Sequence, residues 1–588
     1  MGAYFSLKAM RENIMMSIIN TGGIMKKFFM YAAVGVMLLT SIDLRCFGKK
    51  TIFGIRSQGL DGVRELAGWE QLIYKYDQNS NYGTVAAVVE YSRSFRPGQI
   101  SDFLFGGCSL RFSGSRAERQ EGDILADYFG LPADFSSSVR FSPHISNTIF
   151  DLNWFQAFDA YVPGLFIMVH VPIVHTKWNL YFREGNIQPG TQFYPAGYMS
   201  DTRINASSLP QTVTKALQGT TTFGDMDQPL KYGKIFGIQT RSRVAELQTT
   251  LGWNYNQAWY HVGASMRVGA PTGNATTAEF IFESIIGNRH HWDLGLGLSG
   301  HVVFWQNKDN GRKLAFYADA HVSHLFTSQQ KRSFDFTQNG PGSRYILLEQ
   351  FQPSEGLLIN GVAPARQYMG NLVQAINYTT FDTKISIPVQ GEVVLKFAYQ
   401  HDGIEVDLGY NFWANSKEKL HCRDMFPANT YALKGDAQIY GFATDNSFTL
   451  LNATQNMATV LGGQGNGNSN YQNLNADNPA VATRTTAPAI LFQLNTIDSA
   501  ALNIPQVPVN GSNPALLLSD SDINNESGLL PRALSHRVFV YAGNKWDNRD
   551  DFDPYLGIGL SGEFAHTNPC DNAMCSQWAI WVKAGIAY

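Results

Sequence analysis

Five residues of types that often bind metal ions or move protons lie close together in the sequence: His291, Asp293, His301, Asp319 and His321. In an alternating strand pattern all five fall on one face of two neighbouring strands. Imidazole and carboxylate groups gathered in this way can hold a divalent cation. A row of polar groups that faces water has the same composition. We favour the hydrated face and predict no metal site.

Two glycine-rich motifs have the spacing of a nucleotide-binding loop, Gly295-Leu-Gly297-Leu-Ser-Gly300 and Gly557-Ile-Gly559-Leu-Ser-Gly562. A dinucleotide site needs this motif at a turn from strand to helix. Both copies lie inside long alternating segments, so neither predicts a nucleotide site. No G-x-S-x-G, H-E-x-x-H or P-loop motif stands in a supporting context. We therefore expect no cofactor, no catalytic residue and no enzymatic activity.

The composition narrows the class of protein that must position these residues. Of 588 residues 16% are charged and 13% aromatic, and the net charge is −3. Such a balance gives no attraction for a phosphate backbone, so we expect no nucleic-acid partner. Few charges together with many aromatic residues and glycines also exclude a disordered chain, a coiled coil and a collagen.

The dominant pattern is a strict alternation of apolar and polar residues over segments longer than ordinary strands. Residues 291–305 place Trp292, Leu294 and Leu296 on one face and Asp293, Gly295 and Gly297 on the other. Similar alternation occurs in 84–92, 103–112, 244–254, 257–269, 314–323, 392–400, 404–413 and 555–565. A tilted strand needs about 9–11 residues to cross a bilayer. The pattern predicts an all-β fold, an antiparallel transmembrane β-barrel of about 12–16 strands with long outer loops.

The polar face of these strands predicts which side chains line the barrel interior. It carries isolated charged residues among Gly, Ser, Asn and His, whereas the polar face of a soluble sandwich is usually rich in Lys and Glu. The predicted lumen-lining residues are Glu90, Arg111, Glu246, Arg267, Asp293, Asp319, Lys396, Glu405, Asp407 and Glu563.

The last residues of the chain, QWAIWVKAGIAY, form one more alternating segment that ends on an aromatic residue. Here the chain resembles bacterial outer-membrane β-barrel proteins, whose last strand typically ends in Phe, Tyr or Trp as an assembly signal. The resemblance implies an outer-membrane location, contact with outer-membrane lipid and with the barrel assembly machinery, and an assembly signal that includes Trp578, Ile586 and Tyr588. Family members often have a glycine five residues before the end, where this chain has Lys583.

The start of the chain predicts export. Met25-Lys26-Lys27 precedes a run of twelve apolar residues, which is the pattern of a signal peptide over 25–48. We predict an over-extended start plus signal peptide at 1–48, an N-terminal segment that is partly helical at 49–80, and the barrel at 81–588. Residues 59–75 have helical spacing; we favour a surface or periplasmic helix over a plug inside the barrel.

Short connections such as His401-Asp402-Gly403 predict tight turns, placed on the periplasmic side. Long connections near 185–229, 327–380 and 447–533 would then face outward. Cys570 and Cys575 lie in the last long connection, where exported thiols at this spacing predict a possible disulfide.

Together these features predict a porin-like channel through which small solutes diffuse passively along a water-filled lumen. Two alternatives stay open: a surface adhesin or receptor barrel with a closed lumen, and an outer-membrane barrel enzyme.

Overall fold

The computed structural model describes residues 50–75, 80–120, 122–195, 197–307, 311–352, 368–436, 439–442, 448–450, 454–455, 457–462, 516–546, 552–565 and 572–588. The predicted signal peptide, the residues before it and Cys570 lie outside these ranges. No helix among the described residues is long and apolar enough to cross a membrane.

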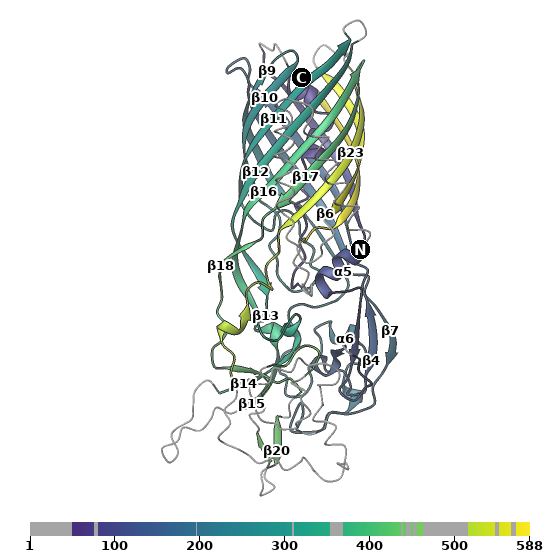
Figure 1. The fold of residues 1–588 in the computed structure, drawn as a ribbon, viewed down its shortest axis with the longest axis vertical. Helices are drawn as coiled ribbons and strands as arrows, with labels where there is room; N and C mark the ends of the chain where they lie inside the picture. Colours follow the sequence, from purple (N-terminus) through teal and green to yellow (C-terminus); the bar gives the residue numbers. More distant parts are fainter. Residues whose placement is uncertain are drawn as a thin grey trace, which may run out of the picture. The chain divides into compact units, whose positions relative to one another are not determined.

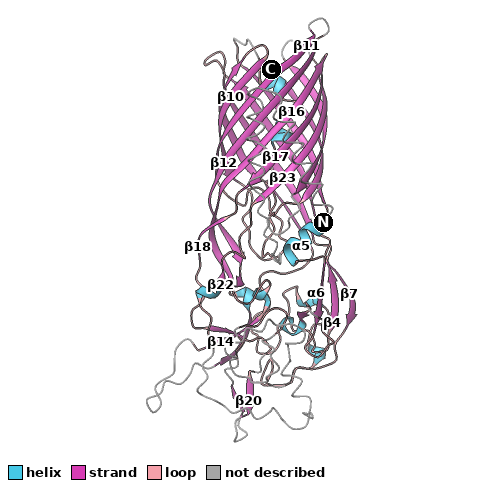
Figure 2. Cartoon of the chain, in the orientation of Figure 1, coloured by secondary structure: helices cyan, strands magenta, loops and turns pink. Residues whose placement is uncertain are grey.

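Twelve long antiparallel strands close into a barrel (Figures 1 and 2). They are β1 (Tyr82–Phe95), β5 (His144–Ala157), β6 (Leu165–Asn179), β9 (Glu246–Asn256), β10 (Tyr260–Pro271), β11 (Asp293–Asn307), β12 (Arg312–Ser333), β16 (Thr380–His401), β17 (Ile404–Asn415), β23 (Ala533–Lys545), β24 (Asp553–Ala565) and β25 (Ser576–Ala587). The predicted fold class is confirmed, and the strand number is the lowest of the predicted range.

Two pairings close the ring, β1 with β25 and β12 with β16. The first runs from Thr84 opposite Ala587 to Phe95 opposite Ser576. It continues past the strand ends, because Gly83 and Tyr588 exchange backbone hydrogen bonds of 2.9 Å in both directions. A closed ring leaves no unpaired strand edge, as lipid requires.

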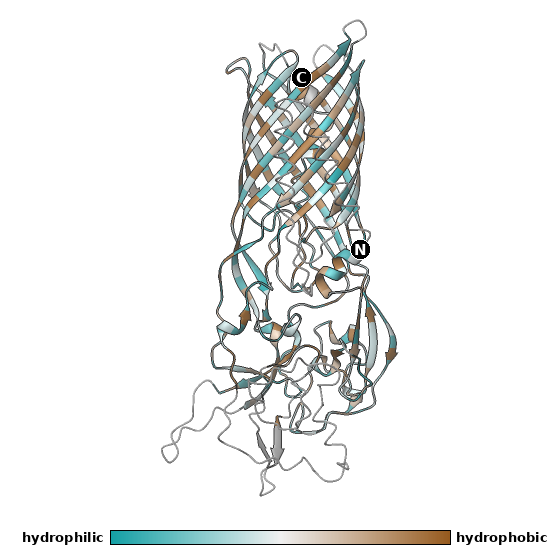
Figure 3. Cartoon of the chain, viewed as in Figure 1, coloured by the Kyte–Doolittle hydropathy of each residue, from teal (hydrophilic) through white to brown (hydrophobic). Residues whose placement is uncertain are grey.

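Hydrophobic and hydrophilic residues alternate along the barrel strands (Figure 3), and the residues that point outward are largely apolar. Leu296 and Leu298 on β11 are 69% and 67% exposed, whereas Gly295 and Gly297, which alternate with them, are buried. Trp578, Ile586 and Tyr588 of the terminal strand are likewise exposed.

The glycines of the two G-x-G-x-x-G motifs make room inside the barrel for large side chains of neighbouring strands. A Cβ atom at Gly297 would lie 2.5 Å from His321, and one at Gly559 would overlap the indole of Trp581. These motifs therefore serve packing between adjacent strands.

The barrel has a short-turn end and a long-loop end. Connections 158–164, 257–259, 308–311, 402–403 and 546–552 join strands at the short-turn end, which also holds Tyr82 and Tyr588. At the other end lie the described parts of connections 96–143, 180–245, 272–292, 334–379, 416–532 and 566–575. The first of these was not predicted, because 103–112 was interpreted as a barrel strand.

The long connections contain short elements of their own. These are α5 (Pro97–Phe105), β2 (Ser109–Ser113), β3 (Ile124–Leu125), η1 (Ala126–Phe129), β4 (Ser136–Arg140), β7 (Arg183–Gln188), η2 (Ala206–Ser208), α6 (Val213–Ala216), β8 (Ile238–Val244), β13 (Asp335–Phe336), η3 (Ser343–Tyr345), β14 (Leu347–Phe351), β15 (Tyr368–Gln374), η4 (Ala375–Asn377), β18 (Lys419–Arg423), β19 (Tyr431–Leu433), β20 (Tyr440–Phe442), β21 (Phe448–Leu450), η6 (Asp520–Asp522) and β22 (Ile523–Asn524). Apolar side chains of many of these elements share one buried core, which includes Phe103, Tyr128, Leu348 and Tyr431 together with Trp178 of β6.

Residues 103–112 show why one predicted strand was wrong. Pro97 starts α5 and Gly106, at φ 74°, ends it, so the apolar residues of 100–105 follow a helical spacing. Arg111 then lies in β2, which pairs with β3 and β4 in a sheet separate from the barrel. Its guanidinium lies 3.6 Å from the Asp123 carboxylate and is one-third exposed, so Arg111 does not line the lumen.

Candidate functional site

The interior of the barrel holds a segment of the chain itself. Residues 50–75, called the plug below, run through the barrel before β1 begins. They contain two short helices, α3 (Gly62–Leu66) and α4 (Glu70–Ile73). Asp61 caps α3 by accepting from the backbone N–H groups of Val63 and Arg64. Between the helices Gly68 adopts φ 70° against the ring of Tyr541, where a Cβ atom would overlap that ring.

Arg64 and Asp61 are the centre of the polar contacts between plug and wall. The Arg64 guanidinium lies 3.0 Å from Asp151 on β5 and 3.2 Å from Glu90 on β1. Asp61 lies 2.6 Å from Arg537 on β23, and Arg537 also lies 2.9 Å from Glu563 on β24. All of these side chains are buried.

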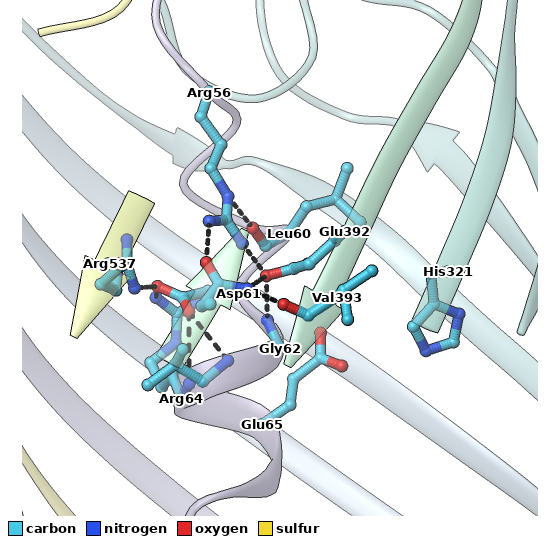
Figure 4. Close-up of polar contacts among 12 residues, drawn as sticks. Arg56, Leu60, Asp61, Gly62, Arg64, Glu65, His321, Glu392, Val393 and Arg537 are labelled. Carbon is cyan, nitrogen blue, oxygen red and sulfur yellow. Dashed lines mark hydrogen bonds and ion pairs between the residues drawn. The ribbon is translucent and has the colours of Figure 1, made fainter. Parts of the chain in front are cut away.

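Arg56 makes a second set of contacts further toward the long-loop end (Figure 4). It forms an ion pair with Glu392 on β16, and its Nη1 lies 4.0 Å from Glu563. The same guanidinium donates to Asn411 at 3.1 Å and to the carbonyl of Leu60 at 2.8 Å. Arg56 and Arg64 of the plug thus supply bases to acidic groups of the wall.

The opposite polarity occurs on the other side of α3. Glu65 accepts from Arg267 on β10 at 2.8 Å. The ammonium group of Lys583 on β25 donates to the carbonyl oxygens of Glu65 at 2.9 Å and Ala67 at 2.7 Å. Lys583 stands where outer-membrane barrels often have glycine, and its role is to hold the end of α3. A buried charge is stable only with such partners.

Toward the short-turn end the plug packs through apolar groups. Trp69, Leu72 and Ile73 are buried against a cluster contributed by several strands. The wall members of this cluster are Tyr82, Ala86, Val88, Phe155, Ala157, Phe166, Met168, Val394, Phe539, Tyr541, Tyr555, Trp581 and Ala587. The Trp69 indole donates to the Tyr555 hydroxyl at 2.6 Å. The predicted water-filled lumen is therefore partly an apolar core.

Nine of the ten predicted lumen residues have buried side chains on barrel strands. Six of them contact the plug directly or through one residue: Glu90, Glu246, Arg267, Asp319, Asp407 and Glu563. Lys396 lies between Glu405 and Asp407, at 3.6 and 2.7 Å. Asp293 accepts from Asn288 at 3.3 Å.

The plug itself is the feature that sequence analysis placed elsewhere. Residues 59–75 were favoured as a surface or periplasmic helix, and the structure instead buries them inside the barrel. One signal was available, because Arg56, Asp61, Arg64 and Glu65 make 56–65 far more charged than the chain as a whole. Once buried, charges of both signs need partners, and here the inner wall of the barrel supplies them.

Of the predicted cysteine pair only Cys575 is described. It is buried just before β25, and burial raises the pKa of its thiol to about 12, so this thiol is a weak nucleophile. Cys570 lies outside the described residues, and the disulfide stays a prediction. Cys108 is exposed between α5 and β2 and does not face lipid on a barrel strand. No group of three or more His, Cys, Asp or Glu side chains that could hold a metal ion occurs in the described part of the chain.

A closed ring of long antiparallel strands with an apolar outer face and a polar inner face decides the architecture. The fold is that of a bacterial outer-membrane β-barrel. No protein-family model and no curated protein matches the sequence. Among solved structures, an outer-membrane channel from Pseudomonas putida F1 is 9% identical, with 86% of this chain and 96% of that chain covered and a TM-score of 0.31.

Two other solved structures are similar at the same level. A FadL homologue from Pseudomonas aeruginosa is 7% identical over 86% of this chain and 90% of its own, with a TM-score of 0.24. The translocator domain of the autotransporter NalP from Neisseria meningitidis is 6% identical over 89% and 93%, with a TM-score of 0.23. These TM-scores are low, so none of the three proteins lends this chain a substrate or a mechanism.

Proposed function

We propose that this protein is an outer-membrane channel for the passive diffusion of small solutes, and that the plug controls passage through it. The observation that carries the proposal is the plug itself, which is held in the lumen by ion pairs, hydrogen bonds and apolar packing, with no covalent cross-link to the wall among the described residues. Such contacts can exchange for water when the segment moves. A barrel that served only as an anchor would need no charged lumen.

The distribution of contacts supports a plug that can be released. Its polar part, around Arg56, Asp61 and Arg64, is bound to wall residues through side chains. Described barrel strands pair with one another in an unbroken ring, so the wall keeps its backbone hydrogen bonds without the plug. Outer-membrane lipid, the assembly machinery and small solutes are the partners that this function implies. It implies no nucleic acid, no cofactor and no catalytic role.

A surface receptor or adhesin with a permanently closed lumen is a second candidate. It is favoured by the large buried core formed by the long connections, which is more than short barrel loops need. The two functions differ in one observable: a receptor does not conduct when its plug is loosened.

Planar-bilayer recording of the full-length protein tests the proposal. We expect rare openings of the wild type, and more frequent openings of Arg56→Met, because the variant leaves Glu392 and Glu563 without this base. Arg312→Met makes the same change at an exposed residue and should match the wild type. If the wild type and Arg56→Met both insert as folded, heat-modifiable barrels and never conduct, the channel function is wrong and the receptor is favoured.

A further inference from the structure

The acidic groups of the lumen fall into two sets according to their partners. Those on β1, β5, β16, β17 and β24 each lie within 4.0 Å of a basic side chain: Glu90, Asp151, Glu392, Glu405, Asp407 and Glu563. Glu246 on β9, Asp293 on β11 and Asp319 on β12 have no such partner among the described residues, although all three are buried. The unpaired carboxyl groups therefore lie within the run of strands β9, β10, β11 and β12, on one side of the lumen.

Two of these groups converge near the long-loop end. In the register of β9, β10 and β11, Gly269 lies between Gln248 and Asp293. Because Gly269 has no side chain, the Asp293 carboxylate occupies the space above it. On the other side the Gln248 amide nitrogen lies 3.5 Å from Glu246 Oε1. Glu246, Gln248 and Asp293 thus form one cluster, called the acidic station below.

The acidic station contains oxygen atoms that the protein leaves without partners. Glu246 Oε2 and Gln248 Oε1 are buried and accept no hydrogen bond, and both residues are fully buried. An unsatisfied buried acceptor is costly unless a water molecule or an ion supplies the missing partner. Carboxylate and carboxamide oxygens are the ligand atoms that small hard cations prefer.

The plug covers this station with small and polar groups. Ser57 donates to Glu246 Oε1 at 2.5 Å, and Gly59 packs so closely that its Cβ atom would lie 2.8 Å from Glu246 Cδ. Asn288 donates to Asp293 Oδ2 at 3.3 Å. Arg267, on the strand between, is bonded to Glu65 of the plug. The plug brings no positive charge within ion-pair distance of Glu246 or Asp293.

We propose that the acidic station binds a small cation and that the channel prefers cations, which pass between the plug and the wall along β9 to β12. This inference rests on the proposed channel function and names its class of solute. Asp319 is the third unpaired carboxyl group on this side of the lumen. It lies opposite Ser299, six residues along β11 from Asp293, or about 20 Å at the usual rise of a strand. Its Oδ2 is again buried without a hydrogen-bond partner.

Reversal potentials in a gradient of KCl test the preference, since they report the ratio of K⁺ to Cl⁻ permeability. We expect the wild type to prefer K⁺, and Glu246→Gln/Asp293→Asn to lower this ratio by about threefold or more. Asp402→Asn, the same change at an exposed turn residue, should leave it unchanged. A wild type that prefers Cl⁻, or a double variant with the wild-type ratio, overturns the inference.

A binding measurement that needs no conduction separates the two proposals. We expect calorimetric titration of Ca²⁺ into the full-length protein in detergent to show binding that the double variant weakens by about tenfold or more. Asp402→Asn should bind as the wild type does. Conduction without cation preference, or Ca²⁺ binding that is equal in all three proteins, refutes the proposed cation site and leaves the proposed channel function unaffected. A protein that binds Ca²⁺ at the station but never conducts overturns the channel alone.

Discussion

Replacing Arg64 by Met should release the plug from the wall. Arg64 holds Asp151 at 3.0 Å and Glu90 at 3.2 Å, and all three side chains are at most 5% exposed. Methionine keeps much of the length of the side chain but leaves two buried carboxylates without their base. Removing one partner of a buried ion pair costs about 3–5 kcal/mol. Since the carboxylates regain water only when the plug leaves, this cost falls on the plugged state.

The magnitude follows directly. At 1.4 kcal/mol for each factor of ten, the loss raises the equilibrium constant for plug release by roughly a hundredfold to a few thousandfold. The assay is the rate at which a membrane-impermeant maleimide labels Val63→Cys, in a background where the native cysteines are serine. Val63 is fully buried in the plugged state, so its labelling rate reports the released fraction.

A compensated variant tests the reasoning itself. Arg64→Met/Glu90→Gln/Asp151→Asn removes the whole charged set, and such a replacement is often nearly neutral. The labelling rate of Val63→Cys should be far lower in this triple variant than in Arg64→Met. If Arg64→Met labels at the rate of its parent, Arg64 does not dock the plug. If the cysteine of the triple variant is labelled as fast as that of Arg64→Met, uncompensated charge is not the reason that the plug is released.

Three further predictions concern the wall and the long-loop end. Lys583→Gly should reach the outer membrane at normal levels, because the lipid-facing row of β25 is unchanged. In this variant the maleimide should label Val63→Cys about tenfold faster or more, because two charged hydrogen bonds to the plug are lost. Slower export with no change in labelling would contradict this prediction. Leu296→Arg should lower the free energy of unfolding in lipid vesicles by about 2–4 kcal/mol, with Leu296→Ile as the control. Gly297→Arg should also destabilise the barrel, because His321 fills the space beside Gly297. A fully stable Gly297→Arg would refute this packing. Burial raises the pKa of Glu418, but the guanidinium groups of Arg332 and Arg289 outweigh this effect and hold the pKa below its ordinary value. The stability that this group contributes is therefore present at neutral pH and is lost as the pH falls through the lowered pKa. Glu418→Gln should show less acid-induced loss of protease resistance in the long connections than the wild type, and equal acid profiles would contradict the ion pairs.

The barrel was largely predictable because alternation with period two survives wherever one face meets lipid and the other meets polar groups. This pattern was missed in β5, β6 and β23, where the inward positions include the apolar or aromatic residues Phe155, Phe166, Met168, Phe539 and Tyr541. They belong to the apolar cluster that contains Trp69 of the plug, so both faces of these strands are apolar in that part. The contents of the lumen thus removed the signal that sequence analysis relies on.

The candidate site was predictable on the wall and not in the plug. Inward positions such as Glu90 and Lys396 follow from strand periodicity alone. The helices of the plug have only five and four residues, too short for a helical stripe to indicate a burial partner. That Arg64 meets Asp151 and Asp61 meets Arg537 depends on the depth and rotation of the plug in the barrel, which no local pattern encodes.

The most direct test of the account is a disulfide between plug and wall. A Cβ atom at Gly62 would lie 2.9 Å from Val394 Cγ2 on β16, so Gly62→Cys/Val394→Cys should cross-link in membranes, in a background where the native cysteines are serine. We predict a cross-link that forms on mild oxidation, shifts gel migration reversibly and abolishes channel openings until it is reduced. Failure of this pair to cross-link in a folded barrel would contradict a plug inside the lumen. Openings that persist in the cross-linked protein would contradict its control of passage.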